Sequence, residues 1–241
     1  IASGVYGGIV GLLKAKTGAH EVIVTIMLNY IASFFILWIL KTKTFLRPNS
    51  INPIAPEIKR SAELPLIFGA DLRIHLGLLI AFVVSAIIWW LLNSSTLGFK
   101  FRAVGANANA AKTAGISTAK VAFTTMFICG ALAGLGGAVH VLGVNHALTA
   151  DIGGSYGFDA ITVALLGRAT VGGTIFAAFL FGALQTGGLS LLSNTGTPVE
   201  IVQVIQALIV LFIATPALIK YIFRIKKQVS EGSIAAKGWN G

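Results

Sequence analysis

The sequence predicts an all-α fold, a polytopic bundle of transmembrane helices with about six spans, one of them short or broken. Composition is the first reason, because 56% of the 241 residues are hydrophobic and only 11% are charged. An average soluble protein has roughly 25% charged residues, which it needs to cover its surface. The single cysteine, Cys129, excludes the other compact alternative, a secreted scaffold held by disulfides. The third reason is a series of long apolar runs.

These runs match the thickness of a lipid bilayer. A hydrocarbon core of about 30 Å requires about 20 apolar residues in a helix. The long apolar runs are Val22–Leu40, Ile74–Leu92, Val121–Val144, Gly172–Leu192 and Val199–Ile219. A shorter run, Gly157–Gly167, predicts a broken, tilted or re-entrant helix. We interpret Ile1–Leu13 as the tail of a further span or an interfacial segment.

The domain organisation follows from these spans. The chain begins with Ile and shows no basic, cleavable leader, so we expect it to be N-terminally incomplete. Residues 1–225 are predicted to form the transmembrane domain, which includes a cytoplasmic loop at 94–120. Residues 226–241 are predicted to form a basic cytoplasmic tail.

Positive charge orients the predicted spans. If each apolar segment crosses once, the N-terminal stretch, the loop 94–120, Arg168 and the tail lie on one side, and they hold most of the 18 Lys and Arg residues. The positive-inside rule places that side, and therefore the C-terminus, in the cytoplasm. The loop 41–73 falls on the opposite side although it is also basic. Because the charge is spread over short loops, it does not indicate a nucleic-acid interface.

Small residues suggest how the helices pack. The chain contains 28 glycines, and helices in lipid associate through close contact at small residues. Small residues four apart share one helix face, and such pairs are Gly4–Gly8, Gly7–Gly11, Gly130–Gly134 and Ala133–Gly137. They indicate either ordinary helix packing or a backbone that slides or lines a pathway.

Polar side chains inside predicted spans are the candidates for a substrate pathway, because they are costly in lipid. The candidates are Thr25, Asn29, His140, Asn145, Asp159 and Gln185. Most are neutral hydrogen-bonding groups, which suit an uncharged polar solute better than an ion. The alternative for each is a hydrogen bond between helices.

The sequence lacks the motifs of several known enzymatic and transport activities. It contains no GxxxxGK[ST] phosphate-binding loop, and His20-Glu21 lacks the second His of a zinc protease motif. Asp151 and Asp159 form a possible carboxylate pair, but Asp159 lies at the expected N-terminus of a helix, where an acidic residue is common. We therefore predict no enzymatic activity, no cofactor and no metal site. No charged pair lies within the long spans, which argues against an ion-driven carrier.

The loop 94–120 is rich in alanine and punctuated by Gly98, Gly105 and Gly115. Alanine favours helix and glycine interrupts it, so the pattern predicts a short helix near Asn109–Ala114. The small exposed face of such a helix can receive a partner.

The stretch TLGFKFRAVGANANAAKTAGIS in this loop resembles the corresponding loop of permease subunits in ABC importers for simple sugars, nucleosides and branched-chain amino acids. Three further stretches agree in the same order, namely Glu21–Ala32, Cys129–Gly143 and Gly157–Gly188. The resemblance covers residues 4–225. Val171 departs from the family pattern, which usually has Pro there, and this affects only the local turn.

The resemblance implies a role for the loop 94–120 and a set of partners. The loop would dock on a separate ATPase subunit through Gly98, Arg102, Ala103, Gly105, Asn107, Ala110, Ala111, Gly115 and Ile116. A second permease subunit, identical or different, and an extracytoplasmic solute-binding lipoprotein would complete the importer in the lipid bilayer of the cell membrane. The stretches TIMLNYIA and VIQALIVLF favour the nucleoside-type branch.

Two alternatives remain open. A self-sufficient secondary transporter or channel for a small polar solute would need no partner, and the broken helix at Gly157–Gly167 favours it. A scaffold subunit would use its polar intramembrane groups only for packing.

Overall fold

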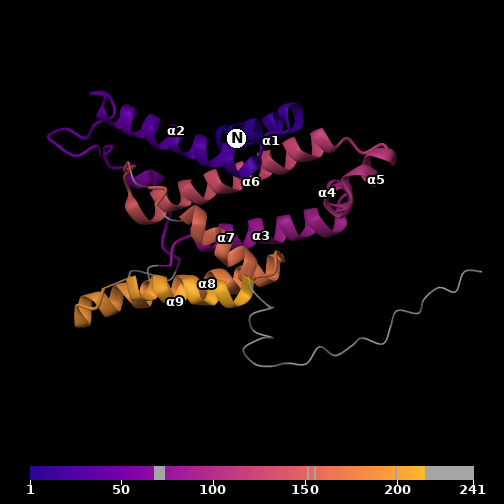
Figure 1. Ribbon diagram of the computed structural model, residues 1–241. Coiled ribbons are helices and arrows are strands. Elements are labelled where there is room, and N and C mark those ends of the chain that lie inside the picture. Colours follow the sequence, from indigo (N-terminus) through magenta and orange to yellow (C-terminus); the bar gives the residue numbers. More distant parts are fainter. Residues whose placement is uncertain (68–73, 151, 155, 199, 215–241) are drawn as a thin grey trace, which may run out of the picture. The chain divides into compact units, whose positions relative to one another are not determined.

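The computed structural model describes residues 1–67, 74–150, 152–154, 156–198 and 200–214 (Figure 1). The helices in order are α1 (Ala2–Thr17), α2 (Glu21–Lys41), α3 (Gly77–Ser94), α4 (Thr96–Ala106), α5 (Ala108–Thr113), α6 (Thr118–His140), α7 (Tyr156–Leu166), α8 (Val171–Thr195) and α9 (Glu200–Ala214). A 3-10 turn, η1 (Arg60–Ala62), and a π-helical turn, η2 (Val141–Asn145), interrupt the connections. The β-pairing within these residues consists of isolated bridges, so the predicted all-α fold is confirmed.

Four helices are long and apolar enough to cross a bilayer, and they confirm four of the five predicted long spans. They are Glu21–Lys41, Gly77–Ser94, Thr118–Asn145 and Val171–Thr195. The fifth predicted span is represented by α9, and the part of Val199–Ile219 beyond Ala214 lies outside the described residues. The predicted short helix is α7, whose 11 residues rise only about 16 Å.

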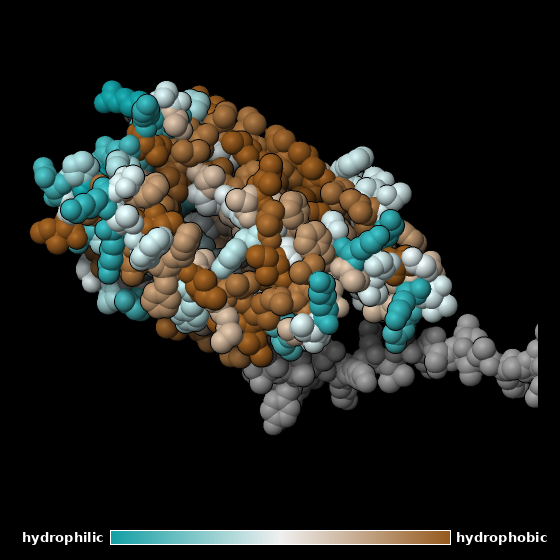
Figure 2. Space-filling model, turned by 90° about the horizontal axis from the view of Figure 1, so that it is seen from above, coloured by the Kyte–Doolittle hydropathy of each residue, from teal (hydrophilic) through white to brown (hydrophobic). Residues whose placement is uncertain are grey.

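The surface of these helices is apolar. Large side chains such as Trp38, Trp89 and Phe176 are more than half exposed. Figure 2 shows a broad hydrophobic surface, with hydrophilic side chains gathered toward the ends of the helices. A water-soluble protein does not leave so many large apolar groups uncovered, whereas lipid covers them without cost. The surface therefore agrees with the predicted membrane location.

The described chain divides into two compact units, residues 1–157 and the residues from Phe158 onward. In the first unit, α1 packs along α6 (Figure 1). A Cβ atom placed on Gly7 would lie 2.6 Å from the carbonyl oxygen of Met126 and 2.9 Å from the Cα of Gly130. A Cβ atom on Gly130 would lie 2.5 Å from the carbonyl oxygen of Ser3. The two backbones are therefore in direct contact, which only glycine permits.

The other small residues divide between contact and open faces. Gly4 and Gly8 on α1 pack against the rings of Phe127 and Phe123 of α6. Gly137, further along α6, has nothing within 4 Å of an added Cβ among the described residues. The predicted small-residue pairs thus hold α1 to α6, with the exception of the Ala133–Gly137 pair.

In the second unit, α7 joins α8 through a tight turn. Arg168 and Ala169 both adopt left-handed backbone conformations, with φ of 52° and 53°. The Thr170 hydroxyl caps α8 by accepting a hydrogen bond from the amide of Gly173 at 3.2 Å. Val171 is the first residue of α8, a position where proline is favoured but not required. The departure from the family pattern at Val171 therefore leaves a regular helix start.

Candidate functional site

The candidate docking loop begins with a braced corner between α3 and α4. The Ser95 hydroxyl donates to the carbonyl oxygen of Leu91 at 2.5 Å and accepts from the amide of Gly98 at 3.0 Å. Arg102 donates to the carbonyl oxygen of Leu92, one of the terminal carbonyls that α3 leaves without a helical partner. Gly98 is buried, and an added Cβ there would collide with the carbonyl oxygens of Leu91 and Leu92. The corner is thus fixed by the side chain of Ser95, which lies between the two helices, and by that of Arg102 on α4.

Asn107 connects α4 to α5. It ends α4 in an extended conformation, with φ of −157°, and it is also the N-cap of α5. Its side-chain oxygen accepts hydrogen bonds from the amides of Asn109 and Ala110 at 3.0 and 3.1 Å. Such a cap satisfies amides at the helix start that otherwise lack partners.

Gly115 ends this short helix. Its φ of +80° is easy for glycine, and its amide donates to the carbonyl oxygen of Lys112 at 3.0 Å. The amide of Ile116 returns to the carbonyl oxygen of Ala111 at 2.9 Å. The helix predicted near Asn109–Ala114 is therefore confirmed as α5, closed by specific interactions at both ends.

The predicted docking residues separate by exposure. Arg102, Gly105, Asn107, Ala110 and Gly115 are exposed. Ala103 and Ile116 are half-buried, and Gly98 and Ala111 are buried. The buried members shape the loop from inside, so only the exposed members are available to a partner.

Ser95, which fixes the corner, is not among the docking residues predicted from the sequence. The signal was present, because a serine before a helix and three residues ahead of Gly98 is typical of an N-cap.

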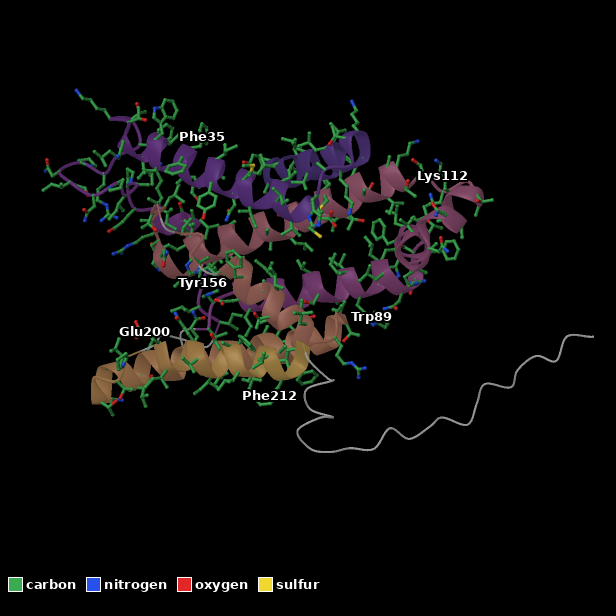
Figure 3. All side chains as sticks on the ribbon, viewed as in Figure 1. Phe35, Trp89, Lys112, Tyr156, Glu200 and Phe212 are labelled. Atoms are coloured by element: carbon green, nitrogen blue, oxygen red, sulfur yellow. The ribbon has the colours of Figure 1, made fainter. Side chains whose placement is uncertain are left out.

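The surface of the loop 94–120 is also cationic. Lys100, Arg102, Lys112 and Lys120 are all exposed, and the loop 94–120 contains no acidic residue (Figure 3 labels Lys112 on α5).

The candidate pathway residues Thr25 and Asn29 lie one turn apart on α2, and both are exposed. The Thr25 hydroxyl donates to the carbonyl oxygen of Val22 at 2.8 Å, so its polar group is satisfied within its own helix. The side-chain amide of Asn29 makes no hydrogen bond within the described part of the chain. Asn29 is therefore the stronger candidate of the two for contact with a solute or a second helix.

Replacing Asn29 with Leu should reduce solute uptake at least about threefold, because transport would lose a polar contact at membrane depth. Uptake by the full-length transporter in proteoliposomes measures the effect, and Thr25→Val serves as the matched control. Unchanged uptake with Asn29→Leu would assign Asn29 to the lipid-facing or packing surface.

His140 and Asn145 lie at one end of α6. His140 is the last residue of α6, and its ring packs edge-on against Tyr156 with centroids 5.3 Å apart. Asn145 ends the π-helical turn η2 and is exposed. Such π-helical turns are rare and are frequent at functional sites. His146 follows with φ of 52°, and its buried Nδ1 has no hydrogen-bond partner among the described residues.

Asp159 and Gln185 belong to the second unit. Asp159 is half-buried in the first turn of α7, where a carboxylate stabilises the helix N-terminus. Gln185 is exposed on α8. Asp151, the other member of the carboxylate pair considered from sequence, lies outside the described residues. Among the candidate pathway residues in the described part of the chain, only His140 and Asn145 lie near the same helix end.

Multiple apolar spans, two of them joined by a capped, cationic, alanine-rich loop, define the class of this chain, the multi-pass membrane proteins. The chain belongs to the family described as branched-chain amino acid transport system, permease component, whose model matches residues 1–214.

Relatives place the chain in the nucleoside branch of that family, as the sequence predicted. The guanosine ABC transporter permease protein of Bacillus subtilis is 39% identical over 233 residues, which cover 94% of this chain and 66% of the relative. The nucleoside ABC transporter permease protein of Lactococcus lactis is 36% identical over 243 residues, covering 96% and 65%. The ribose import permease protein of Escherichia coli K12 is 26% identical over 216 residues, covering 86% and 64%. The chain thus spans just under two thirds of these relatives' length, and no solved structure matches it.

Proposed function

We propose that this chain is the transmembrane permease subunit of an ATP-binding-cassette importer and that it forms the translocation pathway for nucleosides or simple sugars. The observation that carries this proposal is the match over 94% and 96% of the chain to relatives named as guanosine and nucleoside permeases. The neutral character of most candidate pathway residues supports an uncharged polar solute.

The ATPase subunit would bind the exposed residues of α4 and α5. ATP hydrolysis would occur in that separate subunit, because the sequence contains no phosphate-binding loop. The cationic loop 94–120 and the basic tail would lie in the cytoplasm, together with the C-terminus. A second permease subunit and an extracytoplasmic solute-binding protein complete the proposed importer.

Reconstitution tests this proposal. The full-length protein, co-expressed with a candidate ATPase and binding protein, should co-purify with the ATPase. It should take up labelled guanosine or ribose into proteoliposomes only when the vesicles contain ATP. An ATPase variant unable to hydrolyse ATP is the control.

The short helix α7 favours the rival, a self-sufficient transporter with a broken helix. Uptake by the permease alone, without ATP or ATPase, would establish that rival and would contradict the proposed importer.

A further inference from the structure

The half-buried side chain of His75 holds the first turn of α3 in place. Its ring Nδ1 accepts a hydrogen bond from the amide of Gly77, the first residue of α3, at 3.1 Å. A ring nitrogen that accepts carries no proton, so this bond requires a neutral imidazole with its proton on Nε2. Leu76, which directly precedes α3, makes no side-chain hydrogen bond to the helix. His75 therefore supplies the side-chain acceptor at this end of α3.

The same ring packs on the backbone of η2. A Cβ atom placed on Gly143 would lie 3.0 Å from three atoms of the His75 ring, namely Cγ, Nδ1 and Cε1. A Cβ atom on Gly77 would collide with the Val139 side chain of α6. Glycine at these two positions thus lets the start of α3 come close to α6 and η2, with the His75 ring in contact with both glycines.

Backbone hydrogen bonds tie the segment 64–67 to both sides of this contact. Leu66 forms an isolated antiparallel bridge with His75. The amide of Leu64 donates to the carbonyl oxygen of Leu142, in η2, at 3.1 Å. Three pieces of the chain therefore meet at the His75 ring: the start of α3, the segment 64–67 and η2. A change in how the ring binds is transmitted to all three.

The turn η2 links two of the candidate pathway residues, because His140 immediately precedes it and Asn145 ends it. Turns of the π-helical kind are frequent at functional sites. The helical segment Thr118–Asn145 begins directly after α5 and the residues that close it. A contact that fixes η2 therefore fixes candidate pathway residues at the far end of a helix that starts at the candidate docking loop.

We propose that His75 is a proton-sensitive latch, which holds the start of α3 to η2 when its ring is neutral and releases it when the ring is protonated. This inference rests on the proposed function, because its consequence is slower uptake at acidic pH. A protonated Nδ1 cannot accept from the amide of Gly77, so two donors would face each other. The positive end of the α3 dipole also disfavours a cation there. The latch therefore opens as the pH falls through the range, about 8 to 5, in which an imidazole gains its proton.

Other titratable groups border this contact and must be separated from His75. On the segments packed against the ring they are Glu63, His140 and His146. None of these forms an ion pair with His75 in the described part of the chain, and α3 itself contains no titratable residue. Asp71 and Arg73 lie outside the described residues. His140 and His146 titrate in the same range as any imidazole, so each needs its own control.

Two substitutions of His75 separate its hydrogen bond from its charge. Asparagine offers an acceptor oxygen close to the position of Nδ1 but does not titrate, so His75→Asn should stay latched at every pH. Phenylalanine keeps a flat ring but has no acceptor, so His75→Phe should be unlatched at every pH. His140→Asn and His146→Asn are the matched controls, because each removes one other imidazole and leaves His75 intact.

Uptake of labelled guanosine by the full importer is measured in proteoliposomes with the ATPase and ATP inside, at an external pH of about 7.5 and about 5.5. Only the external pH is changed, so the ATPase works under constant conditions. The melting temperature of the purified full-length permease in detergent, at the same two pH values, is the second measurement. It needs neither solute nor partner.

Wild-type uptake should be at least about threefold lower at the acidic pH, which corresponds to the loss of one hydrogen bond. His75→Asn should show nearly equal uptake at the two pH values, and His75→Phe should be low at both. His140→Asn and His146→Asn should keep the wild-type ratio of uptake between the two pH values. Acidification should lower the melting temperature of wild type more than that of His75→Asn.

Wild-type uptake that does not change with pH, or an equal decrease in wild type and His75→Asn, would overturn the latch. A pH dependence that disappears in His140→Asn or His146→Asn would also overturn it, in favour of that ring. Absence of ATP-driven uptake by wild type at both pH values would instead contradict the proposed function. The melting temperatures would then still decide the latch, and an equal fall in wild type and His75→Asn would overturn it.

Discussion

Replacing Ala110 with Arg should abolish ATPase association and solute uptake while membrane insertion and thermal stability stay close to wild type. Ala110 is exposed on α5, so a long side chain there is accommodated in the free permease. Arginine is also a good helix former, and the Asn107 cap on the amide of residue 110 does not involve the side chain that changes. In the importer, the same side chain would occupy the space of the docked ATPase. We expect at least about tenfold less co-purified ATPase, a cost of about 1.4 kcal/mol or more.

Two further substitutions serve as controls for the Ala110→Arg variant. Ala110→Ser keeps the position small and should retain the ATPase. Ala111→Arg places a charge at a site that is only 4% exposed, so it should lower the melting temperature as well as the association. Normal recovery of the ATPase with Ala110→Arg would show that docking uses another surface.

Replacing Gly130 with Leu should displace α1 from α6 and destabilise the first unit by about 1–3 kcal/mol, the usual cost of inserting atoms into a packed contact. No rotamer relieves this clash, because the Cβ atom itself would lie 2.5 Å from the carbonyl oxygen of Ser3 and 3.0 Å from the Cα of Gly7. The melting temperature of the purified full-length protein in detergent measures the loss.

The same substitution at Gly137 is the matched control. Gly137 lies two turns further along the same helix, and an added Cβ there meets nothing within 4 Å in the described structure. Gly137→Leu should therefore leave the melting temperature of the isolated subunit nearly unchanged. Equal destabilisation by both variants would contradict contact between backbones as the cause, because leucine favours helix over glycine at both positions.

Local signals were sufficient to predict most helices, including the short helix α5. A bilayer demands a minimum length, so apolar runs such as Gly172–Leu192 could be located directly, and the structure places α8 there. The position of α5 also depends on neighbouring residues only. Asn107 precedes an alanine-rich stretch, Gly115 follows it, and each supplies the terminal interactions that the short helix needs.

Features that depend on distant contacts could not be predicted in this way. Ala110 and Ala111 are identical in type and adjacent in sequence, and only the packing of α5 against its neighbours makes one exposed and the other buried. The π-helical turn Val141–Asn145 resembles ordinary helix in sequence. The backbone hydrogen bonds that join residues 55–64 to residues 142–148 connect positions 78 to 93 residues apart, and no local sequence pattern predicts such bonds.

The double role of Asn107 has a consequence for how this loop can evolve. Because one residue both ends α4 and begins α5, the connection has no spare length to absorb a change. Each residue inserted into or deleted from α4 would turn everything beyond it by about 100° and shift it by about 1.5 Å. Residues on the exposed face of α5 can therefore be substituted one at a time without moving the rest of that surface, whereas a single insertion or deletion in α4 would turn the whole surface in another direction. The length of this stretch is under tighter constraint than the identity of most of its side chains.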